Sequence, residues 1–486
     1  METAVPFRAW RYAPRAGDLT SLVAPPYDVI GPELQSRLYA AGPYNVVRVD
    51  LGITTPSDTP CDDQYTRAAA QLAEWKERGV LARDLEPSVT FVEETFTGPD
   101  GQLRERHGFL GAMRLYDFDE GVVFPHEHTL SGPKEDRYRL MTATAMSLSP
   151  VFLLYDLPGD GITAAWRAGV GAEEPGASVV DEAGTATKLW PTSDPGLLET
   201  IRKHLENARF VIADGHHRYE TALRYRDQRR AEEAAEGGAG PGAGPESRPP
   251  RDAAPTGAPA YDYALVYFSN MADPGLAIYG THRLVAGLPP QAVAALPRAL
   301  SETFKVERLT GEGEPARAAG GPGAAPPCAA AAAQTAITAY LAEHPRRAFG
   351  LWGPGFEAAY GLELTEAAAA RTAEPGRSAA YRDLDVTILQ SLVLGKALGI
   401  SAADMAAERY VTFFKDQKEA FARLGAGDFQ AGFFMNPTGL DQIREVAFSG
   451  ERMPQKATFF YPKLPTGLVL HDLEGSLWPM PRRRRS

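Results

Sequence analysis

Apolar and polar positions along this chain follow two periods, one of two residues and one of about 3.6, which predict strands and helices respectively. Short runs rich in β-branched residues at Asn45–Asp50 and Ser88–Glu93 predict strands. Between them, Tyr65–Arg78 has helical spacing and stops at Gly79, which is typical of a helix end. The N-terminal region therefore combines strands with helices.

The same alternation continues toward the C-terminus and predicts an α/β fold of the mixed α+β kind. The pattern does not give the order of the strands, and no repeat of fixed period is visible. Further strands are predicted at Leu110–Asp117, Val151–Tyr155, Arg209–Ala213, Tyr263–Phe268 and Ala348–Trp352, and further helices at Leu197–Glu206, Gln291–Thr303 and Leu384–Leu398.

Two stretches rich in Gly, Pro and Ala interrupt this pattern. They hold too few large apolar side chains to offset the entropy of ordering, so both are predicted to be flexible, disordered insertions. Ala329–Ala333 could already begin the helix that continues as QTAITAYLAEH. The predicted organisation is an N-terminal α/β part at 1–230, a flexible insertion at 231–260, a C-terminal α/β part at 261–475 with the second insertion at 311–333, and a basic tail at 476–486.

Composition narrows the class of protein. The 486 residues carry a formal net charge of -12, which argues against general binding to a nucleic-acid backbone. Two distant cysteines, Cys61 and Cys328, can form neither a disulfide framework nor a thiolate metal site. No apolar run approaches the ~18 residues of a membrane span, so we expect a cytoplasmic protein without a membrane partner. Composition leaves the oligomeric state open.

The segment Phe210–Leu223, FVIADGHHRYETAL, carries the strongest chemical signal. An apolar strand ends at Asp-Gly, where the glycine permits a sharp turn or a close ligand, and a helix pattern follows. A helix start offers free N–H groups and a positive dipole end, and an arginine there can fork onto phosphate oxygens. Alternatively, Asp-Gly is only a turn and the histidines are surface residues. The candidate anion-binding residues are Asp214, Gly215, His216, His217 and Arg218.

Two other segments have a similar density of histidine, arginine and acidic residues. Phe124–Arg139 reads as a loop-like polar run, and Asn270–Arg283 follows a strand and ends in Gly-Thr-His-Arg. Each alone is compatible with a solvated loop. Three such clusters in a chain with nine histidines favour one polar cleft. The candidate residues in these two segments are His126, Glu127, His128, Arg137, Thr281, His282 and Arg283.

A transition metal is a possible alternative reading of the histidines. His126 and His128 could join Asp214 or His216 around zinc. However, the chain has no HExxH or CxxC motif, and the neighbouring arginines would repel a cation. A magnesium ion that accompanies nucleotide phosphates, held by one or two carboxylates, is the favoured metal. Asp214 could hold that ion, orient a histidine or accept a proton.

Two terminal segments add candidates. In VAPPYDVI at Val23–Ile30, the Pro-Pro pair fixes an extended segment that presents Tyr27 and Asp28, either to a substrate or simply as a rigid turn. In MPQKATFFYPKLPTGL, Lys456 and Lys463 flank an apolar strand. These lysines could reach an anionic ligand or could solvate a sheet edge.

Five of these segments, in this order, resemble a known family. VAPPYDVI, HEHTLSGPKEDR, ADGHHRYETAL, NMADPGL…THR and MPQKATFFYPKLPTGL are similar to the bacterial and archaeal family called domain of unknown function 1015, or DUF1015. The resemblance covers nearly the whole chain apart from the two insertions. It implies a ParB/sulfiredoxin-like nucleotide-binding core within a larger two-part chain.

The order helix, strand and then DGHHR also resembles ParB-like CTPases, sulfiredoxins and free-serine kinases. That resemblance implies that Gly215, His216, His217 and Arg218 hold nucleotide phosphates. The DGHHR form is closest to the free-serine kinases, which phosphorylate serine. Those kinases are much smaller, and their upstream catalytic glutamate has no aligned counterpart here, so Glu127 and Asp28 are both candidates.

A nucleotide-binding small-molecule kinase, using ATP or ADP with Mg²⁺ and a serine-like acceptor, is the function that these observations favour. Catalytic roles fall to Glu127, Asp28 and His216; metal binding to Asp214 and Glu127; phosphate binding to the DGHHR residues with Thr281, His282 and Arg283; and substrate binding to Tyr27, His126, His128, Arg137 and Lys456.

Two other functions fit the same motifs. One is a ParB-like nucleotide switch or metabolite sensor without robust turnover. ParB-type DNA binding is disfavoured, because no basic helix-turn-helix follows the turn. The other is a phosphatase or another hydrolase of a phosphorylated metabolite, in which the histidines would act as nucleophile or acid.

Overall fold

The computed structural model describes residues 3–98, 100–127, 131–236, 257–309, 327–369 and 376–477. The chain forms two compact units, each of which is described by itself. Unit 1 comprises Met1–Pro125, Thr129–Leu276 and Pro462–Ser486, and unit 2 comprises His126–His128 and Ala277–Tyr461.

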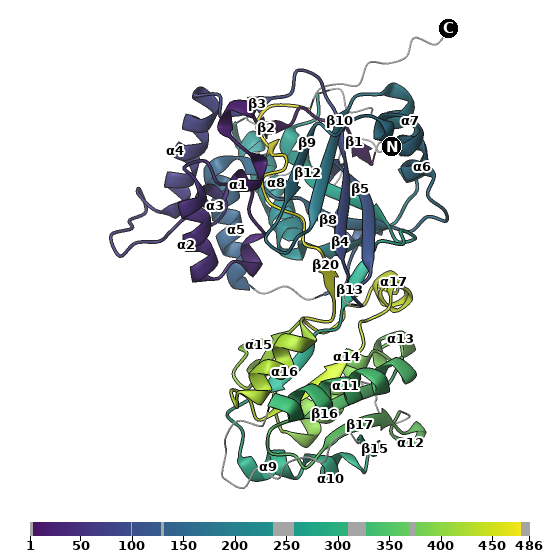
Figure 1. The fold of residues 1–486 in the computed structure, drawn as a ribbon. Helices are drawn as coiled ribbons and strands as arrows, with labels where there is room; N and C mark the ends of the chain where they lie inside the picture. Colours follow the sequence, from purple (N-terminus) through teal and green to yellow (C-terminus); the bar gives the residue numbers. More distant parts are fainter. Residues whose placement is uncertain are drawn as a thin grey trace. The chain divides into compact units, whose positions relative to one another are not determined.

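Unit 1 is built on a large mixed sheet (Figure 1). Its central strands β8 and β12 are buried along their whole length, which explains why both read as continuous apolar runs. β12 pairs parallel with β8 and antiparallel with β5, while β11 pairs antiparallel with β8 and parallel with β6. The order is β6 (Val123–Pro125), β11 (Phe210–Asp214), β8 (Val151–Tyr155), β12 (Tyr263–Asn270), β5 (Leu103–Arg114), β4 (Val89–Thr97), β10 (Ala186–Thr192) and β9 (Ala177–Val180), with β1 (Ala4–Val5) beside β5.

Helices lie beside both faces of this sheet (Figure 1). On one face, α6 and α7 bury Trp166 and Ile201 against sheet residues such as Phe91. On the other, a second apolar core gathers around the fully buried Trp75 of α4. The helices are α1 (Leu19–Leu22), α2 (Pro32–Ala41), α3 (Val47–Asp50), α4 (Gln64–Glu77), α5 (Ser131–Thr144), α6 (Gly161–Ala168), α7 (Pro195–Leu205) and α8 (His216–Glu236).

Short elements complete unit 1. Two small ribbons join segments that are distant in sequence, β2 with β3 and β7 with β21. Their bounds are β2 (Trp10–Tyr12), β3 (Leu81–Arg83), β7 (Met146–Ser147) and β21 (His471–Asp472), and the 3-10 turns are η1 (Pro14–Ala16), η2 (Tyr27–Val29), η3 (Phe118–Glu120), η4 (Val170–Ala172) and η6 (Ala260–Asp262).

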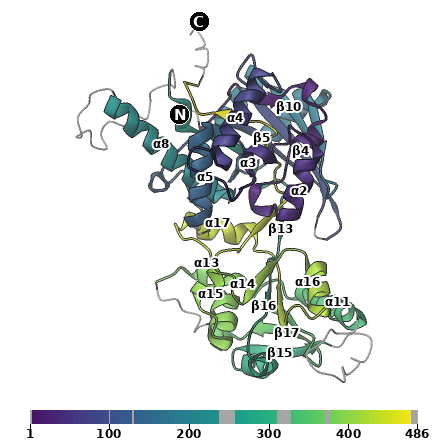
Figure 2. The ribbon, with the colours of Figure 1, turned by 90° about the vertical axis from the view of Figure 1, so that its left-hand side faces the viewer.

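Unit 2 has its own antiparallel sheet, and α11 and α16 lie beside one of its faces (Figure 2). Ile337 and Phe421 fill the core between these helices and the sheet. The strand order is β15 (Phe304–Leu309), β17 (Ala359–Leu364), β16 (Ala348–Trp352), β19 (Ala431–Met435), β14 (His282–Val285) and β18 (Val411–Phe414), and β13 (Ala277–Tyr279) pairs with β20 (Phe459–Tyr461). The helices are α9 (Pro290–Ala294), α10 (Leu296–Leu300), α11 (Pro327–Glu343), α12 (Glu366–Ala369), α13 (Ala379–Arg382), α14 (Asp385–Ile388), the π-helix η7 (Leu389–Ala397), α15 (Ala402–Ala406), α16 (Gln417–Gly425) and α17 (Leu440–Phe448).

Most predicted elements are confirmed, and the mixed α/β class with them. The strands predicted at Val151–Tyr155 and Ala348–Trp352 are β8 and β16. The predicted helix Tyr65–Arg78 is α4, whose start is fixed by a capping box between Asp63 and Thr66. The other predicted strands correspond to β4, β5, β11 and β12, and the predicted helix Leu197–Glu206 to α7.

The strand predicted at Asn45–Asp50 is wrong, because this segment forms α3. The Asn45 side chain accepts from Val47 N at 3.0 Å, and it donates to Ser21 O at 2.8 Å. These hydrogen bonds hold the chain just before a helical turn whose valines are buried in the core around Trp75. Tertiary packing therefore overrides the strand preference of β-branched residues.

The loop-like reading of Phe124–Arg139 is also wrong, since its second half belongs to α5. The single helix predicted at Gln291–Thr303 is divided into α9 and α10. Pro297, in the first turn of α10, cannot continue the hydrogen bonding of a preceding helix. The predicted helix Leu384–Leu398 is α14 followed by η7.

The two predicted insertions are shorter in the structure than in the sequence pattern. Ala231–Glu236 extend α8, and 327–333 begin α11, so these residues are helical. Residues 257–260, at the end of the first predicted insertion, are also described, whereas 237–256, 310–326 and 478–486 lie outside the described residues. β12, placed by the sequence pattern in the C-terminal part, is a central strand of unit 1.

Candidate functional site

The Asp-Gly turn of unit 1 joins β11 to α8. The register of β11 against β8 shifts between Ile212 and Asp214, a β-bulge that turns the end of the strand. Gly215 then has φ +87°, a left-handed conformation that side chains rarely adopt. Tyr219 N donates to Gly215 O at 2.9 Å, so α8 begins directly after the glycine. The predicted strand, turn and helix are all present.

Arg218 folds back over this turn. Its Nη2 lies 2.5 Å from Asp214 Oδ2, and its Nη1 donates to Pro150 O. A Cβ on Gly215 would lie 3.0 Å from Arg218 Nε, so the glycine also leaves room for the guanidinium. Lys463 is paired with the second carboxylate oxygen, Asp214 Oδ1. In this arrangement the Asp214 carboxylate lies between two cationic side chains.

The Arg218 guanidinium is mostly withdrawn from solvent. Its side chain is 12% exposed, and burial lowers the pKa of Arg218, opposed by the charges of Asp28, Tyr27 and Asp50. An arginine stays charged at neutral pH, so a guanidinium in this environment favours a nearby anion. The Arg218 guanidinium is therefore a candidate anion-binding group.

Asp28 and His217 supply a carboxylate and an imidazole to this region, two kinds of side chain that often act as general base. Asp28 lies in the first turn of η2, directly after Pro25-Pro26, and its side chain is exposed. Burial lowers the pKa of His217, with Glu220 acting in the opposite direction and Asp28 also contributing. His216 is buried. The rigid turn therefore presents an accessible carboxylate whose charge acts on both Arg218 and His217.

Arg137 adds a second buried guanidinium from α5. Its Nη1 donates to Asp50 Oδ1 at 3.0 Å, and its Nη2 donates to Asp136 Oδ2 at 2.6 Å. The Arg137 Cζ lies 4.1 Å from the centre of the Tyr27 ring. Burial alone would lower the pKa of Arg137, but Asp50 and Asp136 outweigh it and raise the pKa. We call Tyr27, Asp28, Asp50, Arg137, Asp214 and Arg218 the Arg218 site.

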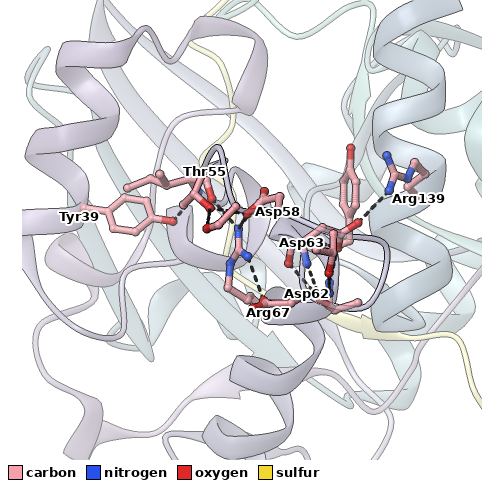
Figure 3. Close-up of polar contacts among 12 residues, drawn as sticks. Tyr39, Thr55, Asp58, Asp62, Asp63, Arg67 and Arg139 are labelled. Carbon is pink, nitrogen blue, oxygen red and sulfur yellow. Dashed lines mark hydrogen bonds and ion pairs between the residues drawn. The ribbon is translucent and has the colours of Figure 1, made fainter.

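The α4 helix and the loop before it hold α5 in place. Arg139 on α5 donates to Asp63 Oδ2 at 2.8 Å, and Tyr65 OH on α4 donates to Asp136 Oδ1 at 2.8 Å. Figure 3 shows Arg139 directed toward Asp63, and Arg67 directed toward Asp58 in the preceding loop. These contacts orient the turn of α5 that carries Arg137.

A small cavity of about 40 Å³ opens among these groups. Asp50, which sequence reasoning did not select, lies at its wall. The sequence signal for Asp50 is an acidic residue that ends the apolar run VVRVD, and the strand predicted for that run does not indicate a site. The polar residues that line the cavity are Tyr27, Asp50, Arg137, Ser147, Ser149, Arg218 and Thr221.

In unit 2, His126 and Glu127 anchor the segment before β20. His126 is fully buried, with Nε2 2.8 Å from Thr458 Oγ1. Glu127 Oε1 accepts from the backbone N–H groups of Ala457 and Thr458, each at 3.1 Å. These contacts tie the His126 segment to the chain before β20. His128 lies outside the described residues.

Thr281, His282 and Arg283 lie at the start of strand β14 in unit 2. Arg283 is fully buried and donates to Lys456 O at 3.0 Å and to Thr281 O. Burial lowers its pKa to about 10, opposed by Glu127. His282 is buried too, and burial lowers its pKa to about 3, which keeps it neutral. The Arg283 guanidinium therefore binds main-chain carbonyls inside the unit.

The predicted metal ligands fall in different units, Asp214 in unit 1 and Glu127 in unit 2. Both oxygens of Asp214 are paired with cations, Arg218 and Lys463, which would repel Mg²⁺. Asp214 therefore does not fit a divalent ion in this arrangement. Elsewhere in the described part of unit 1, Glu93, Glu105 and His107 have the spacing of a metal site, but Arg167 and Lys188 already pair with them.

The fold and this site define a mixed α/β protein with a large mixed sheet and a polar strand-to-helix turn. The chain belongs to the family described as "Protein of unknown function (DUF1015)", which matches residues 4–387. No curated protein matches the sequence significantly. Among the described residues, none of the helices combines the length and apolar character that a membrane crossing requires.

Several solved structures are distantly similar in fold. A conserved hypothetical protein from Pyrococcus furiosus is 13% identical, with 72% of this chain and 91% of that chain covered and a TM-score of 0.30. Free serine kinase in complex with AMP is 12% identical, with 72% and 88% covered and a TM-score of 0.32. SbnI with C-terminal truncation from Staphylococcus aureus is 10% identical, with 76% and 87% covered and a TM-score of 0.32.

Proposed function

We propose that this protein binds a nucleotide at the Arg218 site and transfers a phosphoryl group to the hydroxyl of a small, serine-like acceptor. The observation that carries the proposal is the turn itself. A glycine at φ +87° opens a 21-residue helix, and an arginine one turn later folds over that glycine. The start of a helix, the positive end of its dipole and a guanidinium fork occur together at this turn, which supports a phosphate cradle.

Arg218 would change partner when the nucleotide binds. In the structure Asp214 neutralises it, and Asp214 also has Lys463 as a second partner. A phosphate could therefore take Arg218 from Asp214 without leaving that carboxylate unpaired. Arg218 would then stabilise the charge that develops on the transferring phosphoryl group.

Asp28 is our choice for the group that orients the acceptor hydroxyl and takes its proton. It is exposed, and its charge acts on Arg218. Glu127, the other candidate, already uses Oε1 for three hydrogen bonds to Ala457 and Thr458. A carboxylate that is free to approach the substrate is the better general base.

Thermal-shift and calorimetric titrations with ATP, ADP, CTP and GTP, with and without magnesium, test the first half of the proposal. We expect one nucleotide to stabilise the protein and Arg218→Ala to weaken its binding by about 100-fold, the loss of a charged phosphate contact. Arg224→Ala is the matched control, because Arg224 lies on the same helix with a side chain that is 52% exposed. No binding by any of the four nucleotides would contradict the proposal.

Incubation with γ-labelled nucleotide and a pool of hydroxy amino acids tests the second half. We expect a labelled acceptor whose formation is lost in Asp28→Asn, while that variant still binds the nucleotide. Binding without any labelled product would instead support a nucleotide switch or metabolite sensor. Release of phosphate from phosphorylated metabolites without nucleotide binding would support the hydrolase alternative.

A further inference from the structure

One carboxylate oxygen at the Arg218 site has an unsatisfied position. Asp50 is 4% exposed, and its Oδ1 accepts from Arg137 Nη1 at 3.0 Å. Its Oδ2 is buried and has no hydrogen-bond partner among the described residues. An ionised oxygen buried in this way costs free energy unless a donor reaches it. Most buried polar atoms in native structures have a hydrogen-bond partner, so this oxygen calls for a donor.

The space beside Asp50 belongs to the cavity that Arg137 and Arg218 also line. A cavity needs about 10–15 Å³ to hold one water. The cavity beside Asp50, at about 40 Å³, therefore holds the polar atoms of a small metabolite but not a nucleotide base. The lining includes the Asp50 carboxylate and the guanidinium groups of Arg137 and Arg218. Charges of both signs thus face one small space.

We propose that Asp50 is a specificity-determining residue that binds the ammonium group of a small α-amino acid, whose carboxylate faces Arg137 and Arg218. This inference rests on the proposed function, because it assigns the acceptor half of the same site. An ammonium supplies the donor that Asp50 Oδ2 lacks. A carboxylate supplies the anion that two neighbouring guanidinium groups favour.

Other arrangements explain the geometry less well. A purely structural Asp50–Arg137 pair would leave Oδ2 buried without a partner, which costs free energy, more so for a charged group. Burial does raise the pKa of Asp50, opposed by Arg137 and Arg218. A ligand ammonium would hold the carboxylate ionised and remove that cost. Tyr27 is stacked on Arg137 and lines the same cavity.

The first experiment uses the wild-type protein and three probes that differ by one group. Calorimetric titration with L-serine, 3-hydroxypropanoate and 2-aminoethanol separates the amine from the carboxylate. We expect L-serine to bind, and each of the other two to bind at least about tenfold more weakly, because each loses one charged contact. Binding of 3-hydroxypropanoate as tightly as L-serine, or no binding of L-serine, would overturn the proposal.

The second experiment uses Asp50→Asn, which keeps an acceptor oxygen for Arg137 while removing the charge. We expect L-serine affinity to fall by about 10- to 100-fold, a larger loss than that of nucleotide affinity or of thermal stability. Asp62→Asn is the control, since that carboxylate is 74% exposed and pairs with Arg67. Equal loss of both ligands and of stability in Asp50→Asn would show a structural role and overturn the proposal.

Nucleotide titration separates the two proposals. If the wild type binds nucleotide but not L-serine, the assignment of Asp50 fails and the nucleotide site stands. If it binds L-serine through Asp50 but no nucleotide, the kinase proposal fails and an amino-acid-binding site remains.

Discussion

The tetrapeptide pattern Gly-x-His-Arg occurs once in each unit, with opposite structural consequences. In unit 1, Gly215 precedes helix α8, and Arg218 lies among carboxylates beside a cavity. In unit 2, Gly280 precedes strand β14, and Arg283 is fully buried on main-chain carbonyls. The same side chains therefore form a candidate ligand site in one unit and a structural anchor in the other.

The difference lies in what surrounds each arginine. Arg218 has an acidic partner, Asp214, that can stay paired with Lys463 when a ligand takes the arginine away, and one carbonyl partner, Pro150 O. Arg283 donates to two carbonyls, Thr281 O and Lys456 O, and both lose that donor without it. An arginine is available for a ligand only where its departure leaves few unpaired groups behind.

The largest expected effect is on stability in unit 2. Arg283→Ala empties the space of a fully buried side chain and removes the donor of two carbonyls, so we expect a loss of at least about 3 kcal/mol in the free energy of unfolding. Arg218→Ala should cost less, about 1–2 kcal/mol, because Asp214 keeps Lys463 and only one carbonyl, Pro150 O, loses its donor. Urea denaturation, with hydrogen exchange in β14 and β19, measures both. A larger loss for Arg218→Ala would reverse the comparison.

The pH dependence of stability should also differ between His282 in unit 2 and His217 in unit 1, the histidines of the two Gly-x-His-Arg patterns. The folded-state pKa of His282, about 3, lies below the ordinary 6.5, so its contribution is complete above pH 6.5 and is lost as the pH falls toward 3. Between pH 6.5 and 4.5 this amounts to about 2–3 kcal/mol. His282→Asn should flatten the acid loss by that amount, even if its stability at pH 7 is lower.

His217→Asn is the comparison for this measurement. His217 is less buried, and Glu220 opposes the lowering of its pKa. Its replacement should therefore change the acid slope less than His282→Asn does. Urea unfolding at pH 4.5 and 7 supplies both slopes, and equal slopes would argue against a buried neutral role specific to His282.

Alanine at Gly280 or at Gly215 should lower the free energy of unfolding by about 1–3 kcal/mol, but only the change at Gly215 should affect nucleotide binding. A Cβ at Gly280 would lie 2.4 Å from Met435 O, so Gly280→Ala should destabilise unit 2 without changing nucleotide affinity. Gly215→Ala places an alanine at φ +87° against Arg218, so it should lower nucleotide affinity as well as stability. Titration and unfolding of both variants decide the matter. Normal nucleotide binding in Gly215→Ala would remove the turn from the site.

The smallest expected effect separates charge from shape at Arg218. Arg218→Lys keeps the positive charge but loses the planar fork, so we expect nucleotide affinity to fall by about tenfold with little change in stability. Arg224→Lys, on the exposed side of α8, should bind like wild type. Undiminished binding in Arg218→Lys would mean that charge alone suffices.

Local sequence determined much of this protein. The continuous apolar run of β8, the capping box of α4 and the Asp-Gly turn before α8 all act within a few residues, so their patterns predicted the elements correctly. The residues Tyr27, Asp28, Arg137, Asp214 and Arg218 were also chosen from their motifs, and unit 1 brings them together.

Only the tertiary structure decided the rest. Asn45–Asp50 has the composition of a strand, but its valines pack around Trp75 as a helix, and that packing places Asp50 beside Arg137. Likewise, no local pattern distinguishes Gly-x-His-Arg in unit 1 from the same pattern in unit 2. Burial and partner choice depend on chain segments hundreds of residues away, such as Lys463 beside Asp214, and local sequence carries no record of them.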